Sequence, residues 1–171
     1  MALAGFGRAP AIIAEATKKS DLLWLGSDDW LPTAAWHIWH ADSAYVLTGP
    51  GEQPLPSITD LPTAAVTVRS KDNLNRVVTW EALVWRIIPG TEDWDEVAPL
   101  LLAKRLNLPD TEFALERWAR ECTVIRLEPT GRLLEAGASL PVESGALPPR
   151  PTPATTRVRV PFTLGRRRRR A

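Results

Sequence analysis

Residues 33–49, which read TAAWHIWHADSAYVLTG, are the most informative stretch of the sequence. Two apolar runs, Thr33–His40 and Ala44–Thr48, are separated by residues with turn character, and this spacing predicts an antiparallel β-hairpin. The odd spacing of His37 and His40 places the two imidazoles on opposite faces of the first strand, which argues against a metal ion shared between them. The stretch therefore predicts a β-rich fold with aromatic and histidine side chains on both faces of one strand.

Four more segments have the composition of strands, and they are residues 21–26, 63–71, 76–88 and 122–127. In 63–71 apolar and polar residues alternate, so one face is predicted to be buried. In 76–88 both faces are apolar, which predicts that one face fills a barrel and the other meets helices or a second subunit. Glu128-Pro129-Thr130-Gly131 follows the last strand and is predicted to be a turn.

Three segments are predicted to be helical. Pro10 suits the first position of a helix that ends at Lys19. Thr91 is placed to cap a second helix, in which Pro99 predicts a kink or a division into two short helices. A third helix is expected to start at Asp110 or at the residue after it. Five or six short antiparallel strands, with helices gathered late in the chain, predict an α+β fold built on a β-barrel.

The composition is that of a globular domain. The chain has 171 residues, 44% of them apolar, and a single cysteine, which leaves no disulfide within the chain. A cytoplasmic location is therefore expected, and no stretch reaches the ~20 apolar residues that a membrane helix needs. Eight tryptophans are many for this length, and contacts in the core or between subunits are the simplest explanation for each of them.

Charge is distributed unevenly along the chain. Residues 1–149 hold 13 Lys and Arg against 20 Asp and Glu, a net charge of −7, whereas residues 150–171 hold eight arginines and no acid. The run Arg166–Arg170 has three interpretations: it binds nucleic acid or another polyanion, it folds back on the acidic body, or it is a disordered end. Contact with nucleic acid is the least favoured of the three, because no nucleic-acid-binding motif supports it.

The common catalytic and metal-binding motifs are missing from the sequence. There is no glycine-rich dinucleotide or phosphate loop. Two histidines and one cysteine do not make a zinc site of the usual spacing, so no metal site is predicted.

The order of segments resembles the flavin-binding split barrels of the pyridoxamine 5′-phosphate oxidase-like superfamily, in particular its small actinobacterial-type members. The resemblance covers about residues 15–130. It comprises the Trp- and His-rich strand, the hairpin ending in Thr48-Gly49, a loop, the segment AVTVRSKD at 65–72 and a long strand. It implies a split β-barrel homodimer that binds FMN or a deazaflavin in clefts between its subunits and acts on a small molecule.

In this superfamily the loop after Thr-Gly usually brings a lysine or arginine to the cofactor phosphate. Here the loop reads Gly51-Glu52-Gln53-Pro54, so the expected cation is missing and Glu52 would repel a phosphate. Seven residues are the candidates for cofactor binding that the resemblance and the strand pattern provide together. They are Trp36, His37, Trp39, Thr48, Gln53, Arg69 and Lys71.

Each candidate also has a structural interpretation. Arg69 and Lys71 lie on the polar face of a strand, where they either bind a phosphate or form a solvated face. The Trp and His side chains of residues 36–40 either line an isoalloxazine pocket or pack in the core. Thr48 either bonds the phosphate or belongs only to the hairpin.

Three functions remain open at this point. The first is an FMN- or deazaflavin-dependent oxidoreductase, in which the flavin does the redox chemistry and no catalytic side chain is assigned. The second is a split barrel without cofactor or catalysis that binds a small molecule or a protein. The third is a polyanion-binding protein. The predicted organisation is an N-terminal helix in 1–20, a split-barrel domain in 21–135, and a Pro/Ala-rich disordered linker with the arginine tail in 136–171.

Overall fold

A computed structural model describes residues 10–27, 30–55, 58–73, 75–106, 108 and 110–142 of the chain. The contacts divide the chain into two units, Met1–Pro141 and Val142–Ala171, and the fold below is that of the first unit. The arginine run Arg166–Arg170 lies outside the described residues. None of the helices in the described ranges is long and apolar enough to cross a membrane.

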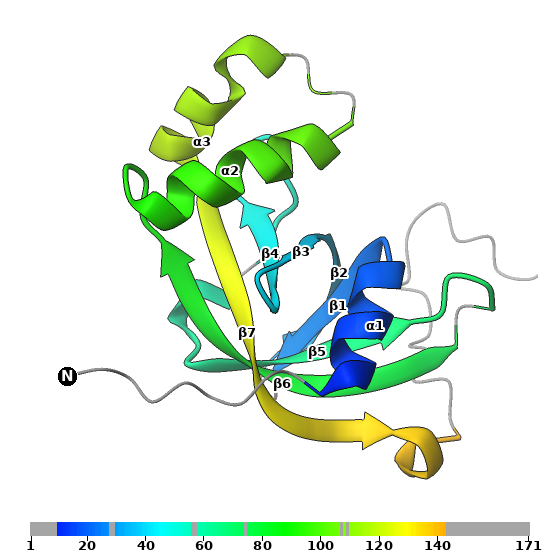
Figure 1. Cartoon of the computed structure of the whole chain (residues 1–171). Coiled ribbons are helices and arrows are strands. Elements are labelled where there is room, and N and C mark those ends of the chain that lie inside the picture. The colour runs from blue at the N-terminus through cyan, green and yellow to red at the C-terminus, as the bar shows by residue number, and fades with distance from the viewer. Residues whose placement is uncertain are drawn as a thin grey trace, which may run out of the picture. The chain divides into compact units, whose positions relative to one another are not determined.

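The strands of the first unit form one antiparallel sheet (Figure 1). They are β1 (Leu22–Ser27), β2 (Trp30–Trp36), β3 (Ile38–His40), β4 (Ser43–Thr48), β5 (Thr63–Arg69), β6 (Arg76–Ile87) and β7 (Thr123–Ala136). Their order across the sheet is β2-β1-β5-β6-β7-β4-β3. Strands β2 and β3 are consecutive in the chain yet stand at opposite edges of the sheet. The sheet is therefore curled, so that the single segment 30–40 forms both edges.

That segment is the first strand of the predicted hairpin, and it changes partner at His37. Trp36 pairs with Leu22 of β1, whereas Ile38 pairs with Tyr45 of β4. The prediction of one continuous strand over 33–40 is therefore wrong at this residue, where the barrel is split. The hairpin itself is confirmed. Its turn is tight because Ala41 and Asp42 both have left-handed backbones, with φ of 43° and 56°.

The interior of the barrel is filled by the inward face of each strand. In β5 the burial alternates along the strand, as the sequence predicted. In β6 the inward face includes Trp80, which is fully buried, while Trp85 on the outward face is 46% exposed. The buried residues around Trp80 that form this core include Leu23, Leu25, Val46, Val66, Val68, Val78, Ile125 and Leu127.

Strand β7 is longer than the sequence predicted. It runs through Pro129 and Gly131, so the expected turn at 128–131 is wrong. Pairing with β6 continues on both sides of it, from Ile87↔Val124 to Val78↔Ala136, with register shifts near Trp80. These irregularities, together with φ of +87° at Gly131, accommodate the turn-forming residues inside a strand.

Three helices of the described part of the chain pack on the barrel. They are α1 (Ala11–Lys19), α2 (Glu92–Lys104) and α3 (Ala114–Glu121), with short 3₁₀ turns η1 (Ile58–Asp60), η2 (Thr111–Phe113) and η3 (Gly137–Ser139). The side chain of Thr91 caps α2 as predicted, accepting a hydrogen bond from the Trp94 N–H. Pro99 lies within one uninterrupted helix, so of the two expected outcomes, a kink or a division into two short helices, the division is wrong.

Helices α2 and α3 lie together over one end of β4 and β7 (Figure 1). They form a second buried cluster outside the barrel, centred on Trp94, Leu101 and Trp118 and joined by Leu47 and Val124 from the strands. The candidate site residues are distributed between the barrel core and this helical cluster.

Candidate functional site

The structure distributes the seven predicted cofactor residues over three places around the barrel. Trp36, Thr48 and Gln53 lie at the split of the barrel beside the loop that follows β4, His37 and Trp39 face α1 and the barrel interior, and Arg69 and Lys71 lie at the end of β5. The three places are described in turn.

Gln53 completes the backbone hydrogen bonding of Trp36. The Trp36 N–H donates to Gln53 Oε1 at 2.8 Å, and Gln53 Nε2 donates to the Trp36 carbonyl at 3.1 Å. The carboxamide thus takes the place of a neighbouring strand where β2 leaves the sheet. In this conformation the two polar groups of Gln53 are used by the protein itself.

Thr48 and Gly49 shape the loop that follows β4. Thr48 Oγ1 accepts a hydrogen bond from the Leu55 N–H at 3.0 Å. Gly49 has φ of +144°, and a Cβ added there would lie 2.8 Å from Cys122 Cα and 3.0 Å from the Glu121 carbonyl oxygen. The Thr-Gly pair therefore has a steric and hydrogen-bonding role that does not depend on a ligand.

Glu52 lies at the centre of a buried charge cluster. Its side chain is 0% exposed and accepts hydrogen bonds from Arg105 Nε at 2.9 Å, Arg117 at 3.0 Å and Trp118 Nε1 at 3.0 Å. Arg117 also bonds Asp110 at 2.6 Å, and these two carboxylates, Asp110 first, raise the pKa of its guanidinium. The acidic residue that would repel a phosphate is thus neutralised inside the protein.

The sequence did not identify the partners of Glu52. Arg105, Arg117 and Trp118 lie 53, 65 and 66 residues further along the chain. The local signal in the sequence was an acid directly after Gly51, where a cation was expected. The Arg105 guanidinium also lies 5.8 Å from the centre of the Trp36 ring, which connects this cluster to the split of the barrel.

His37 is buried where the barrel splits. It is 1% exposed, and its Nε2–H donates to the Thr17 carbonyl of α1 at 3.0 Å. Its Nδ1 has no hydrogen-bond partner within the described ranges. Burial lowers the pKa of His37 from 6.5 to about 4, so the imidazole is neutral at neutral pH.

Trp39 belongs to the barrel interior. It is partly buried against the core, and its ring meets that of Trp80 edge to face, with 6.5 Å between the ring centres. Such contacts are typical of packed aromatic pairs. On the opposite face of the same strand, His40 Nε2 donates to Glu96 of α2 at 2.7 Å. No set of three or more metal-ligating side chains occurs in the part of the chain that is described.

Arg69 and Lys71 lie near each other but have different neighbours. The Arg69 guanidinium lies over the Trp24 ring at 4.9 Å from its centre. Lys71 Nζ lies 2.8 Å from Asp21, and this pair raises the pKa of Lys71 and lowers that of Asp21. Both partners of the ion pair are more than 60% exposed, so water and salt screen it.

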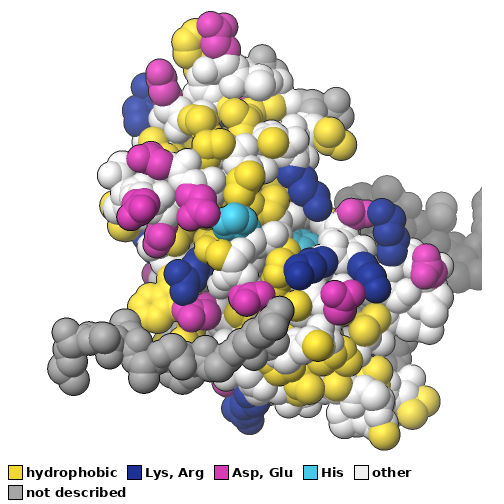
Figure 2. Space-filling view, viewed as in Figure 1, with side chains coloured by type: hydrophobic (Ala, Val, Ile, Leu, Met, Phe, Trp, Pro, Cys, Tyr) yellow, Lys and Arg dark blue, Asp and Glu magenta, His cyan; other side chains and the backbone are white. Residues whose placement is uncertain are grey.

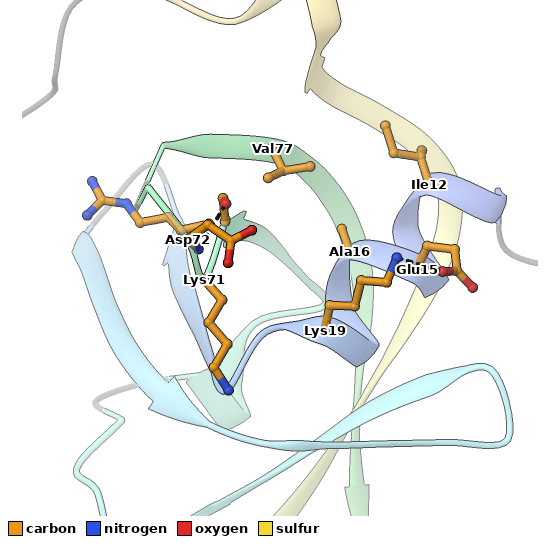
Figure 3. A pocket seen from close by; sticks show the side chains of 9 residues that line it. Ile12, Glu15, Ala16, Lys19, Lys71, Asp72 and Val77 are labelled. Carbon is orange, nitrogen blue, oxygen red and sulfur yellow. Dashed lines mark hydrogen bonds and ion pairs between the residues drawn. The ribbon is translucent and has the colours of Figure 1, made fainter.

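A cavity of about 500 Å³ lies between α1 and the turn that joins β5 to β6 (Figure 3). Its lining includes both predicted cations of β5. The lining residues are Ile12, Glu15, Ala16, Lys19, Arg69, Ser70, Lys71, Asp72 and Val77. Apolar side chains of α1 and β6 thus meet lysine and arginine side chains in one hollow, and the size lies within the range of small-molecule sites.

The charges near this cavity are mixed in sign. Figure 2 shows Lys and Arg side chains interspersed with Asp and Glu around the two histidines. Lys19 pairs with Glu15 at 3.3 Å across one turn of α1, and both side chains are exposed. A ligand with an anionic group would compete with exposed carboxylates here, whereas at Glu52 it would have to displace a buried one.

A second cavity of about 480 Å³ is lined by residues of β1, β2, β5, β6 and β7 and of the segment before β5, and it contains none of the seven predicted residues. Its charged members, Glu81 and Arg132, bond each other at 3.0 Å. Of these two cavities, the one at α1 includes predicted site residues.

A curled antiparallel sheet that is split at His37, with helices packed outside it, is a split β-barrel. HutZ, the heme storage protein from Vibrio cholerae, has this fold with a TM-score of 0.52 and 15% identity, covering 75% of this chain and 94% of its own. The flavocytochrome Anf3 from Azotobacter vinelandii matches with a TM-score of 0.46 and 13% identity, over 86% and 84%. The FAD and heme binding protein from Mycobacterium smegmatis matches with 0.43 and 15%, over 71% and 67%.

No protein-family model matches the chain, and no curated protein matches it either. The likeness to solved structures therefore concerns the fold, and the predicted split barrel is confirmed.

Proposed function

We propose that the protein binds a flavin-type cofactor, FMN or a deazaflavin, in the cavity beside α1 and acts as an oxidoreductase on a small molecule. The observation that carries the proposal is the cavity of about 500 Å³ whose lining joins Arg69 and Lys71 to an apolar wall. Phosphate needs cationic donors, and a flavin ring needs apolar contact. A cytoplasmic location is part of the proposal.

In this proposal Arg69, Lys71 and Lys19 hold the phosphate, while Ile12, Ala16 and Val77 contact the ring. The screened pairs Lys71–Asp21 and Lys19–Glu15 allow a phosphate to replace a carboxylate at small cost. A bound flavin supplies the redox chemistry, and the chain supplies binding, orientation and exclusion of water. The other five predicted residues, Trp36, His37, Trp39, Thr48 and Gln53, are then positioning residues that maintain the barrel around the split.

Titration with FMN tests this proposal. We expect the wild-type protein to quench FMN fluorescence with saturation. Arg69→Ala and Lys71→Ala should each weaken binding on the order of 10-fold, because each removes a charge-assisted hydrogen bond. Lys18→Ala is the matched control, since Lys18 is exposed on α1 and does not line the cavity. Unchanged affinity in both cavity variants would remove the phosphate assignment.

A second candidate function is a split barrel that binds a ligand without catalysis. The buried pairs of Glu52 favour it, because the loop after β4 supplies no cation and its polar groups are used internally. If wild-type protein binds neither FMN nor a deazaflavin, this second function replaces the first. Heme is added in a parallel titration, read at its Soret band, because a heme storage protein shares the fold.

We also propose that the protein is a homodimer that uses the outward face of β6. Trp85 on this face is 46% exposed, and Ile88 just beyond the strand is 53% exposed. Large aromatic side chains at such positions are typical of interface centres. The resemblance described in the sequence analysis implies a homodimer, and this supports a second copy of the chain as the partner.

Replacing Trp85 by aspartate should dissociate the dimer. Loss of one central tryptophan costs on the order of 2 kcal/mol, or about 30-fold in Kd. Sedimentation velocity at matched concentrations measures the change. Leu106→Asp is the control, because Leu106 is 74% exposed but lies after α2. A wild-type monomer, or a Trp85→Asp protein that still sediments as a dimer, would contradict this interface.

A further inference from the structure

Helix α1 closes the barrel on one side and forms a wall of the cavity on the other. Ile13 and Thr17 are 0% exposed against the barrel, whereas Ile12 and Ala16 line the cavity (Figure 3). The helix has nine residues, a length that is not stable alone in water. Its position therefore depends on the contacts that hold it against the barrel.

One of those contacts is a buried hydrogen bond to the split of the barrel. His37 Nε2–H donates to the Thr17 carbonyl at 3.0 Å. Neither His37 Nδ1 nor Thr17 Oγ1 has a hydrogen-bond partner among the residues described. A neutral imidazole fits this environment, because its unprotonated Nδ1 needs no acceptor. A protonated imidazole would carry a second N–H donor at Nδ1 and a positive charge in this buried position, where the described residues offer Nδ1 no acceptor.

We propose that α1 is a latch that a proton on His37 releases, so that acidification opens the wall of the cavity. Release turns the Thr17 carbonyl and His37 toward water and frees Ile12 and Ala16 from the cavity lining. Access of a ligand to the cavity then depends on pH through the population of docked and released α1.

The charged groups that face His37 act in opposite directions. Lys104, at the end of α2, lowers the pKa of His37, and Asp21, just before β1, raises it. Burial is the largest influence, and the hydrogen bond to Thr17 opposes it only in part. The nearby charges are themselves paired. Asp21 pairs with Lys71, and on α1 Glu15 pairs with Lys19.

The sign of the effect follows from the pKa of His37 with α1 docked and with α1 released. The pKa is about 4 when α1 is docked and 6.5, the ordinary value, when it is released. Docking is therefore fully favoured above pH 6.5 and weakens as the pH falls toward 4. Between pH 8 and pH 5 the equilibrium shifts toward release by about 30-fold.

Amide hydrogen exchange of the full chain, corrected for the intrinsic pH dependence, measures this shift. We expect protection at Ala14–Ser20 to fall about 30-fold from pH 8 to pH 5, while protection in β4 and β5 is unchanged. His37→Gln should abolish the fall, because its amide can still donate to Thr17 but does not titrate in this range. Glu15→Gln, the control for the acidic residue of α1, should retain it.

Constant protection in α1 across this range would overturn the latch. An equal fall in α1 and in the barrel strands, or an undiminished fall in His37→Gln, would overturn it as well. The inference rests on the proposed function only for the identity of the ligand. Since this experiment contains no ligand, its failure is distinguishable from failure of FMN to bind.

Discussion

Glu52→Gln is expected to lower the free energy of unfolding by about 3 kcal/mol, because it removes the buried counter-charge that Arg105 and Arg117 share and leaves Arg117 with Asp110. The substitution keeps the shape of the side chain and an oxygen for Trp118 Nε1. It removes the charge that holds Arg105 and Arg117, which are 27% and 19% exposed, against the same carboxylate. Urea unfolding followed by tryptophan fluorescence measures the loss.

Glu15→Gln provides the matched control for this experiment. Glu15 pairs with Lys19, but both side chains are exposed, at 63% and 78%. Such a pair contributes about 0.5 kcal/mol or less. If the two Glu→Gln variants were destabilised equally, the Glu52 cluster would not be the buried anchor that fixes the loop to α2 and α3.

Gly49→Ala is expected to destabilise the fold on the order of 3 kcal/mol, through backbone strain together with overpacking. The φ of +144° is unfavourable for alanine, and the new Cβ would lie 2.8 Å from Cys122 Cα and 3.0 Å from the Glu121 carbonyl oxygen. These are backbone atoms, which cannot move aside as the end of a flexible side chain can. Thermal and urea unfolding measure the effect.

Gly131→Ala separates the two causes of that loss. Gly131 also has a positive φ, +87°, but no atom of the described residues lies within 4 Å of an added Cβ. The conformational penalty alone should cost about 1 kcal/mol. A Gly49→Ala protein that is no less stable than Gly131→Ala would mean that the loop moves away from Cys122 without cost. Thr48-Gly49 would then lack the steric role assigned to it.

Local signals in the sequence predicted most of the barrel. The hairpin of β3 and β4 was predictable because turn residues stand between two apolar runs, and β5 because its alternation has the period of a strand. At Pro129 and Gly131 local signals were misleading. Their turn chemistry was real, but pairing with β6 and shifts in register kept both residues within β7.

The candidate site was less predictable because its contacts join distant segments. The acid in the loop after β4 was evident, but the arginines that neutralise it come from the region of α2 and α3. Likewise Lys71 was identified from the polar face of its strand, whereas its position beside α1 depends on how the sheet curls. Spacing along a strand determines the face of a side chain and leaves open what packs opposite it.

The order of strands has a consequence for how the chain reaches its native state. The hairpins β1–β2 and β3–β4 form from neighbouring residues, but β4 pairs with β7, which is almost the last element of the barrel. Long-range pairing of this kind makes folding slow, on the order of milliseconds to seconds. A nascent chain that has not yet produced β7 exposes the backbones of both β4 and β6, so its greatest risk of aggregation falls late in synthesis.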